Sequence, residues 1–453
     1  MNENNKIKPN GLALLPFIIF VGMYLGVGII LTLNGDKLGF YTVPAYISTI
    51  VGIIAAFILF RDSVNKKFEQ LVAGCGESNI IIMCLVFLLA GAFSKVTANM
   101  GSVDSVVNLG LTYIPPQFLA AGVFIIASFV SFSIGTSVGT VATMGAIVFE
   151  LASKTGISPA LMLATLLCGA MFGDGLTVIS MTTIASTKIL NIDINSKFKN
   201  HLKLVVPAFV LTVILLLVFG SPKDIGNINI GDFSFVKIIP YIFVLVVALI
   251  GVNVFMVLTC GIILSGMIGI ATKDFTLLKF TTSINEGFMG VIDVLIFSLL
   301  IGGLAYMVQQ HGGIEWLNVN LKKFIKGKKS AQIVSLLMMM IVNIALANNT
   351  VSVIITGAVL GDVSKNFKVD PRKMSSIVCV AACVTQGLIP YGAQALMVTS
   401  YSNGAVAPVH LIPYLWYFFL LILSTVISVF IPFDKDKTEW DYETHAPVAS
   451  TKA

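Results

Sequence analysis

The residues in this sequence best suited to ion chemistry surround one carboxylate, Asp174, in a long apolar stretch. Gly173 and Gly175 flank it, and Thr177 follows. A carboxylate among apolar residues is costly, and in a membrane span it is usually kept to bind a cation or carry a proton. Glycine on both sides favours an unwound backbone, whose carbonyls could join the carboxylate as oxygen ligands for a hard cation such as Na⁺. The alternative is a helix cap in which Asp174 is hydrogen-bonded to Thr177.

Polar residues interrupt three other apolar runs, at 133–137, 347–350 and 385–392. Helix ends and unwound backbone at such places expose N–H and C=O groups, which transporters use as ligands near the middle of the membrane. Serine and threonine are weaker candidates than Asp174, because a hydroxyl can bond back to its own helix. The candidate ion- or substrate-binding residues are Asp174, Gly173, Gly175, Thr177, Ser133, Thr136, Ser137, Asn348, Asn349, Thr350, Gln386 and Gly387, with Thr182, Thr183, Ser186, Tyr391 and Gln394 as secondary candidates.

The elements that position these residues are membrane helices. Of the 453 residues, 57% are hydrophobic and 11% are charged, so most of the chain cannot face water. We therefore expect an all-α polytopic membrane protein with no water-soluble domain. Segments near the ~20 residues that a bilayer requires are predicted at 11–33, 41–60, 79–93, 202–220, 235–252, 255–270, 291–308 and 411–431.

The formal charge of +6 is a topology signal and not a sign of nucleic-acid binding, because the Lys and Arg residues cluster beside the predicted helices. A cytoplasmic position for these clusters accounts for most of the 28 Lys and Arg. Both termini are then cytoplasmic, in a multi-pass protein of the cell membrane. This arrangement requires two short spans within 235–270 that turn near Gly251.

The sequence also resembles itself at one constant offset, the spacing that separates Pro159 from Pro371 and Gly175 from Gly387. Most of the matches fall on Gly and Pro, where backbone geometry selects the residue. We expect two repeats, 1–220 and 234–432, followed by a cytoplasmic tail at 433–453. The charge clusters orient the two repeats in opposite directions, and inverted repeats are typical of secondary transporters.

Each repeat is expected to contain one re-entrant hairpin and one broken transmembrane helix. The hairpins, at about 118–154 and 331–364, are too long for a single span and carry a polar tip. The broken helices, at about 159–190 and 371–400, begin at a proline and are interrupted by glycine. Non-helical backbone at membrane depth is tolerated only where it is buried in protein or lines a wet cavity. The two tips and the two breaks are therefore expected to converge on one site.

The segment from Gly169 to Thr187 resembles the signature of the NhaC-type Na⁺/H⁺ antiporters, which reads close to GAMFGDNLSxISDTTIAAT. In the second half, the stretches TGAVLGD, PRKMSSIV and TQGLIPYGAQ fit the same family, so the resemblance covers about 91–432. It implies membership of the larger ion transporter superfamily. In that superfamily, hairpins and broken helices form a mobile transport domain of the elevator type, usually within a homodimer.

Two departures from the family signature bear on the substrate. Gly175 stands where the family has Asn, and Met181 stands where it has a second aspartate before the Thr-Thr pair. The expected function is NhaC-like Na⁺/H⁺ antiport with Na⁺ at Asp174. The alternative is a Na⁺- or H⁺-coupled symporter or exchanger of an amino acid or a small carboxylate. Na⁺, H⁺ or both would be the coupling ions, and no cofactor is expected.

Other classes of protein fit the sequence less well. It contains no HExxH, GxSxG or phosphate-binding loop, so no enzyme is indicated. Paired hairpins and broken helices favour alternating access over a continuous channel filter. The six cysteines lie in or beside apolar runs without a CxxC pair, which favours buried free thiols. Expected partners are membrane lipid, a small ion or solute, and a second copy of the chain.

Overall fold

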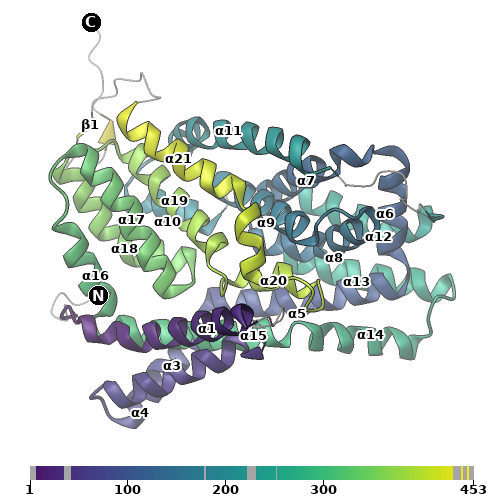
Figure 1. The fold of residues 1–453 in the computed structure, drawn as a ribbon, viewed down its shortest axis with the longest axis horizontal. Coiled ribbons are helices and arrows are strands. Elements are labelled where there is room, and N and C mark those ends of the chain that lie inside the picture. Colours follow the sequence, from purple (N-terminus) through teal and green to yellow (C-terminus); the bar gives the residue numbers. More distant parts are fainter. Residues whose placement is uncertain are drawn as a thin grey trace, which may run out of the picture.

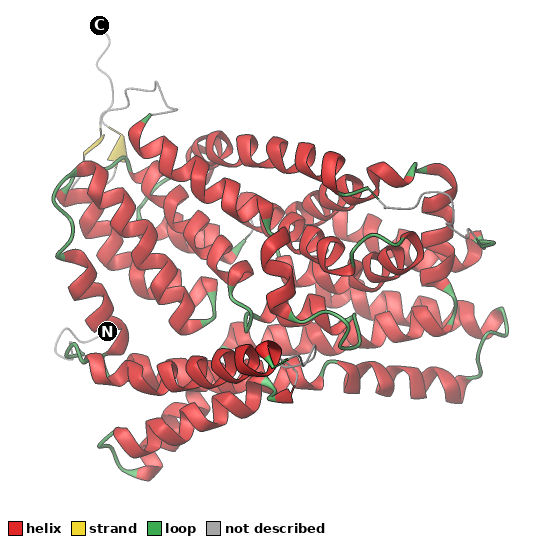
Figure 2. Cartoon of the chain, in the orientation of Figure 1, coloured by secondary structure: helices red, strands yellow, loops and turns green. Residues whose placement is uncertain are grey.

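The computed structural model describes residues 7–34, 42–177, 180–221, 231–250, 252–431, 440–441 and 446–447. Over these residues the chain is helical, apart from one antiparallel pair of two-residue strands, β1 (Trp440–Asp441) and β2 (Ala446–Pro447) (Figure 2). The longer helices are α1 (Leu15–Leu33), α3 (Ala45–Leu59), α5 (Ser78–Asn99), α7 (Leu119–Ile134), α8 (Ser137–Thr155), α9 (Pro159–Leu176), α11 (Ile194–Phe219), α12 (Phe235–Leu249), α13 (Val254–Ala271), α15 (Ile292–Gln310), α17 (Lys328–Leu346), α18 (Asn349–Asn366), α19 (Pro371–Leu388) and α21 (Trp416–Phe430).

Among the described residues, eight helices are long and apolar enough to cross a membrane, or up to ten if each of two bent pairs is one span. The chain is therefore a multi-pass membrane protein, as the composition predicts. The segment 235–270 forms two helices, α12 and α13, as the charge clusters require. Gly251, where the turn between them was expected, lies outside the described residues, as do both chain ends.

The described residues also form six shorter helices, and four of them have no counterpart among the predicted elements: α4 (Val64–Cys75), α6 (Ser102–Tyr113), α14 (Leu277–Gly290) and α16 (Gly313–Lys322). In α4 and α14 polar residues are interspersed among the apolar ones, so a search for continuous apolar runs misses them. The other two, α10 (Met181–Ile189) and α20 (Ala393–Ser400), follow the breaks after α9 and α19. Short 3₁₀ helices occur at Gly11–Leu14, Pro116–Phe118 and Pro408–Tyr414.

The helices α9 and α19 occupy the centre of the molecule, with α11 and α21 along one side and α1, α3 and α15 along the opposite side (Figure 1). Nearly every residue of α9 and α19 is buried. Each begins with a proline, Pro159 or Pro371, at the first helical position, where a missing N–H costs nothing. The two helices whose ends carry the candidate residues are therefore the most enclosed in the protein.

Local structure recurs at the sequence offset that separates Pro159 from Pro371. The bounds of α9 and α19 differ by this offset at both ends, and α7 and α17 end at equivalent residues. Gly135 and Ala347, which follow α7 and α17, are also equivalent, and both adopt left-handed backbone with φ of 79° and 48°. A side chain of α7, Ser131, donates to the C=O of Ala170, and the equivalent Asn343 donates to the C=O of Ala382.

Glycine contacts join helices from the two halves. Helix α5 packs along α14, and α4 packs along α15. A Cβ at Gly91 would lie 2.3 Å from the backbone oxygen of Gly287, and a Cβ at Gly74 would lie 2.7 Å from the Cα of Gly303. Only glycine permits backbones to approach this closely. Gly91 and Gly303 are equivalent residues of the two halves. In each half, therefore, one short helix, α4 or α14, packs against a long helix of the other half.

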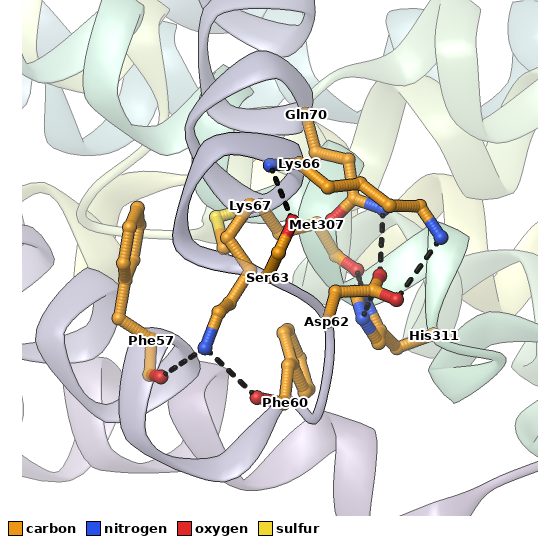
Figure 3. Close-up of polar contacts among 9 residues, drawn as sticks. All are labelled: Phe57, Phe60, Asp62, Ser63, Lys66, Lys67, Gln70, Met307 and His311. Atoms are coloured by element: carbon orange, nitrogen blue, oxygen red, sulfur yellow. Dashed lines mark hydrogen bonds and ion pairs between the residues drawn. The ribbon is translucent and has the colours of Figure 1, made fainter.

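The turn between α3 and α4 is tied to the end of α15 by a polar cluster (Figure 3). Asp62 Oδ2 lies 3.1 Å from His311 Nε2, and Asp62 Oδ1 lies 3.0 Å from Lys66 Nζ. The Phe60 ring stacks on the His311 ring with centroids 3.8 Å apart. The hydrogen bond from Lys66 lowers the pKa of Asp62, and the charges of Lys66 and His311 act in the same direction, against the opposing effect of partial burial.

Candidate functional site

Asp174 lies in the last turn of α9, and its carboxylate oxygens accept three hydrogen bonds. Oδ2 accepts from the backbone N–H of Ser137 at 3.1 Å and from the Ser137 hydroxyl at 2.7 Å. Oδ1 accepts from the Ser180 hydroxyl at 2.8 Å. Ser137 begins α8 and Ser180 precedes α10, so the positive ends of two helices face the carboxylate. The side chain is buried, and a buried charge is tolerated only with such partners.

A chain of hydrogen bonds links Asp174 to the second half of the protein. Gln394 Nε2 donates to Ser137 Oγ at 3.3 Å. Gln386 Nε2 donates to Gln394 Oε1 at 2.9 Å and to the C=O of Ala347 at 3.1 Å. Gln386 lies at the end of α19, Gln394 at the start of α20, and Ala347 between α17 and α18. Both helix breaks and both tips between paired helices thus contribute to one polar cluster.

A buried lysine, missed by the sequence analysis, lies beside this cluster. Lys197 is 1% exposed, and its Nζ donates to the C=O of Gly175 at 3.2 Å and to Thr183 Oγ1 at 3.0 Å. The span predicted from the sequence begins at residue 202, which places Lys197 in a cytoplasmic basic cluster. Helix α11 instead begins at Ile194. Lys197 and His201 are one helical turn apart and lie directly before an apolar run. This spacing is the sequence signal that indicates a helix with both side chains on one buried face.

The prediction that glycine unwinds the backbone around Asp174 is wrong. Helix α9 continues through Gly173, Asp174 and Gly175 to Leu176, and the interruption comes between Leu176 and Met181. Gly173 serves close packing instead, because a Cβ there would lie 2.4 Å from the backbone nitrogen of Phe132 on α7. The carboxylate is therefore presented from a regular helical turn that is held against its neighbour.

The second broken helix is also continuous through its glycine. Helix α19 continues through Gln386 and Gly387 to Leu388, and α20 follows with a bend of 41°. A Cβ at Gly387 would lie 2.4 Å from the Phe418 ring, so this glycine also makes room for a neighbour. Tyr391 lies in the break and donates from its hydroxyl to the C=O of Ile344 at 3.1 Å.

Several of the predicted binding residues form hydrogen bonds near their own helix ends and do not belong to the polar cluster. Ser133 donates to the C=O of Phe129 at 3.0 Å, and Asn348 accepts from the N–H of Val351 at 3.1 Å. Local contacts of the same kind involve Thr136, Asn349 and Thr350. The buried side chains of Thr182, Thr183 and Ser186 lie on α10, where Ser186 accepts from the Ser375 hydroxyl of α19 at 3.0 Å.

Met181, which stands at the second aspartate position of the NhaC-type signature, is 56% exposed. It begins α10, directly after Ser180. Asp174, by contrast, is buried. A carboxylate at residue 181 would therefore lie outside the cluster around Asp174, so the departure at Met181 leaves the oxygen partners of Asp174 in place.

Two cavities lie near the end of α20. One, of about 370 Å³, is lined in part by Glu150 and Glu286, and the other, of about 300 Å³, is lined in part by Asp293 and Leu396. They share one residue at the end of α20, one in the turn that follows it and one at the end of α14. Leu396 lies on the same helix as Gln394, and carboxylates along such walls raise the local concentration of cations.

These features define a class of protein. A buried carboxylate stands at the end of a broken helix, is linked to a second broken helix, and lies within at least eight helices that are long and apolar enough to cross a membrane. Sites of this kind belong to membrane transporters. The profile of the Na⁺/H⁺ antiporter family matches residues 10–221 and 226–433, and the chain belongs to this family.

Individual relatives are similar over nearly their whole length. The chain is 25% identical over 464 residues to the malate-2H⁺/Na⁺-lactate antiporter of Bacillus subtilis, covering 94% of this chain and 97% of that protein. It is 23% identical over 430 residues to the Na⁺/H⁺ antiporter NhaC of the same organism, covering 87% and 92%. The crystal structure of the Alcanivorax borkumensis YdaH transporter aligns with 82% of this chain and 89% of that chain at 14% identity and a TM-score of 0.42.

Proposed function

We propose that this protein is a secondary transporter of the cell membrane that exchanges Na⁺ for H⁺, with Asp174 as the group that takes the two ions in turn. The observation that supports this proposal is which groups donate hydrogen bonds to the Asp174 carboxylate. In the described part of the chain these partners are uncharged hydroxyl and backbone groups. A buried carboxylate without an ion-paired partner is open to a cation or a proton, because either one removes the cost of the buried charge.

The same geometry suits both ions. When Asp174 is ionised, its oxygens and the lone pairs of the Ser137 and Ser180 hydroxyls offer the oxygen ligands that a hard cation prefers. When Asp174 is protonated, its O–H donates to one of these hydroxyls, which rotate to accept. Na⁺ and H⁺ therefore exclude each other at one carboxylate, which is the requirement for coupled exchange.

The architecture that we propose for transport is a pair of inverted repeats, 1–220 and 234–432, in a homodimer of the elevator type. The recurrence of helix bounds between the two halves at one constant offset supports the repeats. The exchange of α4 and α14 between the halves supports a two-fold relation between them. We further propose that both termini and the tail 433–453 are cytoplasmic, and that the protein carries no cofactor and catalyses no covalent reaction.

A second candidate function is coupled transport of an amino acid or a small carboxylate. One observation favours it: Gln386 Oε1 is buried and has no hydrogen-bond partner among the described residues. An unsatisfied buried acceptor costs ~1–3 kcal/mol, and an ammonium or carboxylic acid group of a solute would satisfy it. The similarity to a relative named as a malate-2H⁺/Na⁺-lactate antiporter points in the same direction.

The test uses purified protein in liposomes that contain a pH-sensitive dye and carry a Na⁺ gradient, without organic solute. We expect the internal pH to follow the Na⁺ gradient, and we expect no response in liposomes without protein. If the internal pH changes only after an amino acid or a carboxylate is added, simple Na⁺/H⁺ antiport is overturned. That result would support coupled transport of the added solute.

A further inference from the structure

An apolar groove of about 180 Å³ lies among the helices α6, α7, α8 and α12. The side chains that line it are apolar except for those of Thr143 and Tyr241, and both hydroxyls already have partners. Thr143 Oγ1 donates to the C=O of Thr140 at 3.0 Å. Tyr241 Oη lies 3.0 Å from Thr97 Oγ1. The described lining therefore leaves no side-chain polar group for a hydrophilic ligand, and an apolar cavity of this kind stays free of water.

The groove opens on an apolar surface of the protein. Two of its lining residues, Ile114 and Ile126, are 40% and 42% exposed. Ile242, next to the lining residue Tyr241 on α12, is 54% exposed. The chain is a multi-pass membrane protein, and α7 is part of one of its candidate membrane spans. The mouth of the groove therefore faces lipid acyl chains.

Two glycines leave part of the groove open. Gly110 on α6 and Gly122 on α7 line it, and a Cβ at either position would meet nothing within 4 Å. Glycine within a helix is less stable than alanine. At Gly91 and Gly173 this loss is offset by close packing against a neighbouring helix, but Gly110 and Gly122 have no such contact. They leave room for an occupant from outside the chain.

One end of the groove carries charged side chains. Asp104 lies one turn before the lining residue Val107 on α6, and Lys154 lies one turn after the lining residue Leu151 on α8. Asp104 and Lys154 form an ion pair, and Glu150 lies 3.8 Å from the same lysine. A charged end that adjoins an apolar groove matches the boundary between the headgroups and the hydrocarbon core of a bilayer.

The charges at this end favour one kind of headgroup. Lys237 pairs with Asp274, and its Nζ would lie 3.6 Å from a Cβ at Gly101, directly before α6. With the partners of Lys154, these ion pairs contain two ammonium groups and three carboxylates. An anionic headgroup would be repelled by the excess carboxylate, whereas a primary ammonium can donate to carboxylate lone pairs. Asp104, with its side chain 58% exposed, is the most accessible of the three carboxylates.

We propose that the groove binds an acyl chain of phosphatidylethanolamine and that the primary ammonium of this lipid binds at Asp104. An apolar cavity of about 150 Å³ holds a benzene molecule, so the volume of the groove is sufficient for a segment of an acyl chain. The bound lipid lies between the paired helices α7 and α8 on one side and α6 and α12 on the other. This inference does not depend on which solute the protein transports.

The experiment measures lipid binding to the purified, delipidated full-length protein by native mass spectrometry. The probes are dioleoyl phosphatidylethanolamine, phosphatidylcholine and phosphatidylglycerol. The wild type should bind the first of these more tightly than the other two by about two- to fivefold, the range for an exposed ion pair. Asp104→Asn should remove this preference, because a neutral amide has no charge to attract the ammonium. Glu69→Gln, which removes an exposed carboxylate from α4, should retain it.

A second variant tests the groove itself. Gly122→Leu places a side chain in the groove and should weaken the tightest binding of all three lipids by about tenfold or more, the effect of excluding two methylene groups. The matched control is Gly22→Leu, at an exposed glycine of α1 whose added Cβ also meets nothing within 4 Å. If Gly122→Leu does not accumulate, Gly110→Leu fills the groove from α6 and should show the same loss.

Three outcomes would overturn the inference. The first is lipid affinity that is unchanged when the groove is filled. The second is a change from dimer to monomer in the filled variant at unchanged lipid affinity, because a second copy of the chain would then cover the groove. The third is equal affinity of the wild type for phosphatidylethanolamine and phosphatidylglycerol. None of them would affect the test of Na⁺/H⁺ exchange.

Discussion

Asp174 and Gln386 occupy equivalent positions in the two halves, each two residues before the end of its broken helix. One is a carboxylate and the other carries a neutral amide, and they are joined through Ser137 and Gln394. The two halves therefore place a charged and an uncharged group at matching points of one hydrogen-bonded cluster. Among the described residues, this asymmetry leaves Asp174 as the one carboxylate in the cluster.

Asp174→Asn should abolish coupled exchange and leave the protein folded in the membrane. The amide keeps the shape of the side chain, and it costs less to bury than a carboxylate. Na⁺-driven pH change in liposomes and size-exclusion chromatography in detergent measure the two effects. Glu69→Gln, which removes an exposed carboxylate from α4, should leave exchange unchanged. Normal exchange by Asp174→Asn would show that Asp174 has only a structural role.

Ser137→Ala should weaken Na⁺ affinity by about tenfold or more, because a hydrogen bond to a charged group contributes ~1.5–3 kcal/mol. The hydroxyl donates to Asp174 at 2.7 Å and would itself be a Na⁺ ligand. Ser133→Ala is the matched control, since Ser133 lies on the same tip but bonds only to its own helix. Calorimetric titration of both variants with Na⁺ checks the difference. Equal affinities would place Na⁺ elsewhere.

Gly91→Ala should destabilise the protein by ~1–3 kcal/mol or more, the range for overpacking a tight contact. The added Cβ would lie 2.3 Å from the backbone oxygen of Gly287, which cannot move without shifting α14. Gly110→Ala is the control, because a Cβ there meets nothing within 4 Å. Thermal unfolding in detergent gives the comparison. A stable Gly91→Ala variant would mean that α5 and α14 can separate without loss.

The sequence was sufficient to predict the elements that carry strong local signals. The prolines at 159 and 371 define the starts of α9 and α19, and the rarity of a carboxylate in an apolar span singles out Asp174. It was not sufficient where tertiary contacts decide. Gly173 packs against α7 and Gly175 faces Cys383 of α19, and neither glycine unwinds the helix, which no local pattern distinguishes. The position of Lys197 does not follow from the sequence, because a cytoplasmic lysine cluster and a buried lysine one turn inside a helix have the same composition.

Acidification should remove the stabilisation that Asp62 provides. The pKa of Asp62 is lowered in the folded protein, first by the hydrogen bond from Lys66. Its contribution is therefore fully present above the unfolded pKa of about 3.9 and is lost as pH falls through the lower folded value. The difference in melting temperature between wild type and Asp62→Asn should be largest near neutral pH, should begin to shrink as pH falls through about 4, and should vanish only below the lowered pKa of the folded state. A difference that persists at low pH would contradict the ion-pair explanation.

The proposed opposite orientation of the repeats predicts sided labelling. In a background without the native cysteines, Ser153→Cys at the exposed end of α8 should react with an impermeant thiol reagent only from outside the cell. Asn366→Cys, at the exposed end of α18, should react only from the cytoplasmic side of inverted vesicles. Denatured samples labelled in full serve as the reference for both. Reaction of both from one side would exclude the inverted arrangement.

The close contact of α4 with α15 has a consequence for how the protein is made. Val64–Cys75 leaves the ribosome long before its partner Ile292–Gln310 is synthesised. At roughly 5–20 residues per second this interval is on the order of tens of seconds. During that time the newly synthesised α4 segment has no helix partner. Because its lysines and apolar residues are interspersed, it can bind at the surface of the lipid bilayer. The contact between Gly74 and Gly303 can therefore form only after most of the polypeptide has been inserted. The first half of the protein thus depends on the second half to complete its folding.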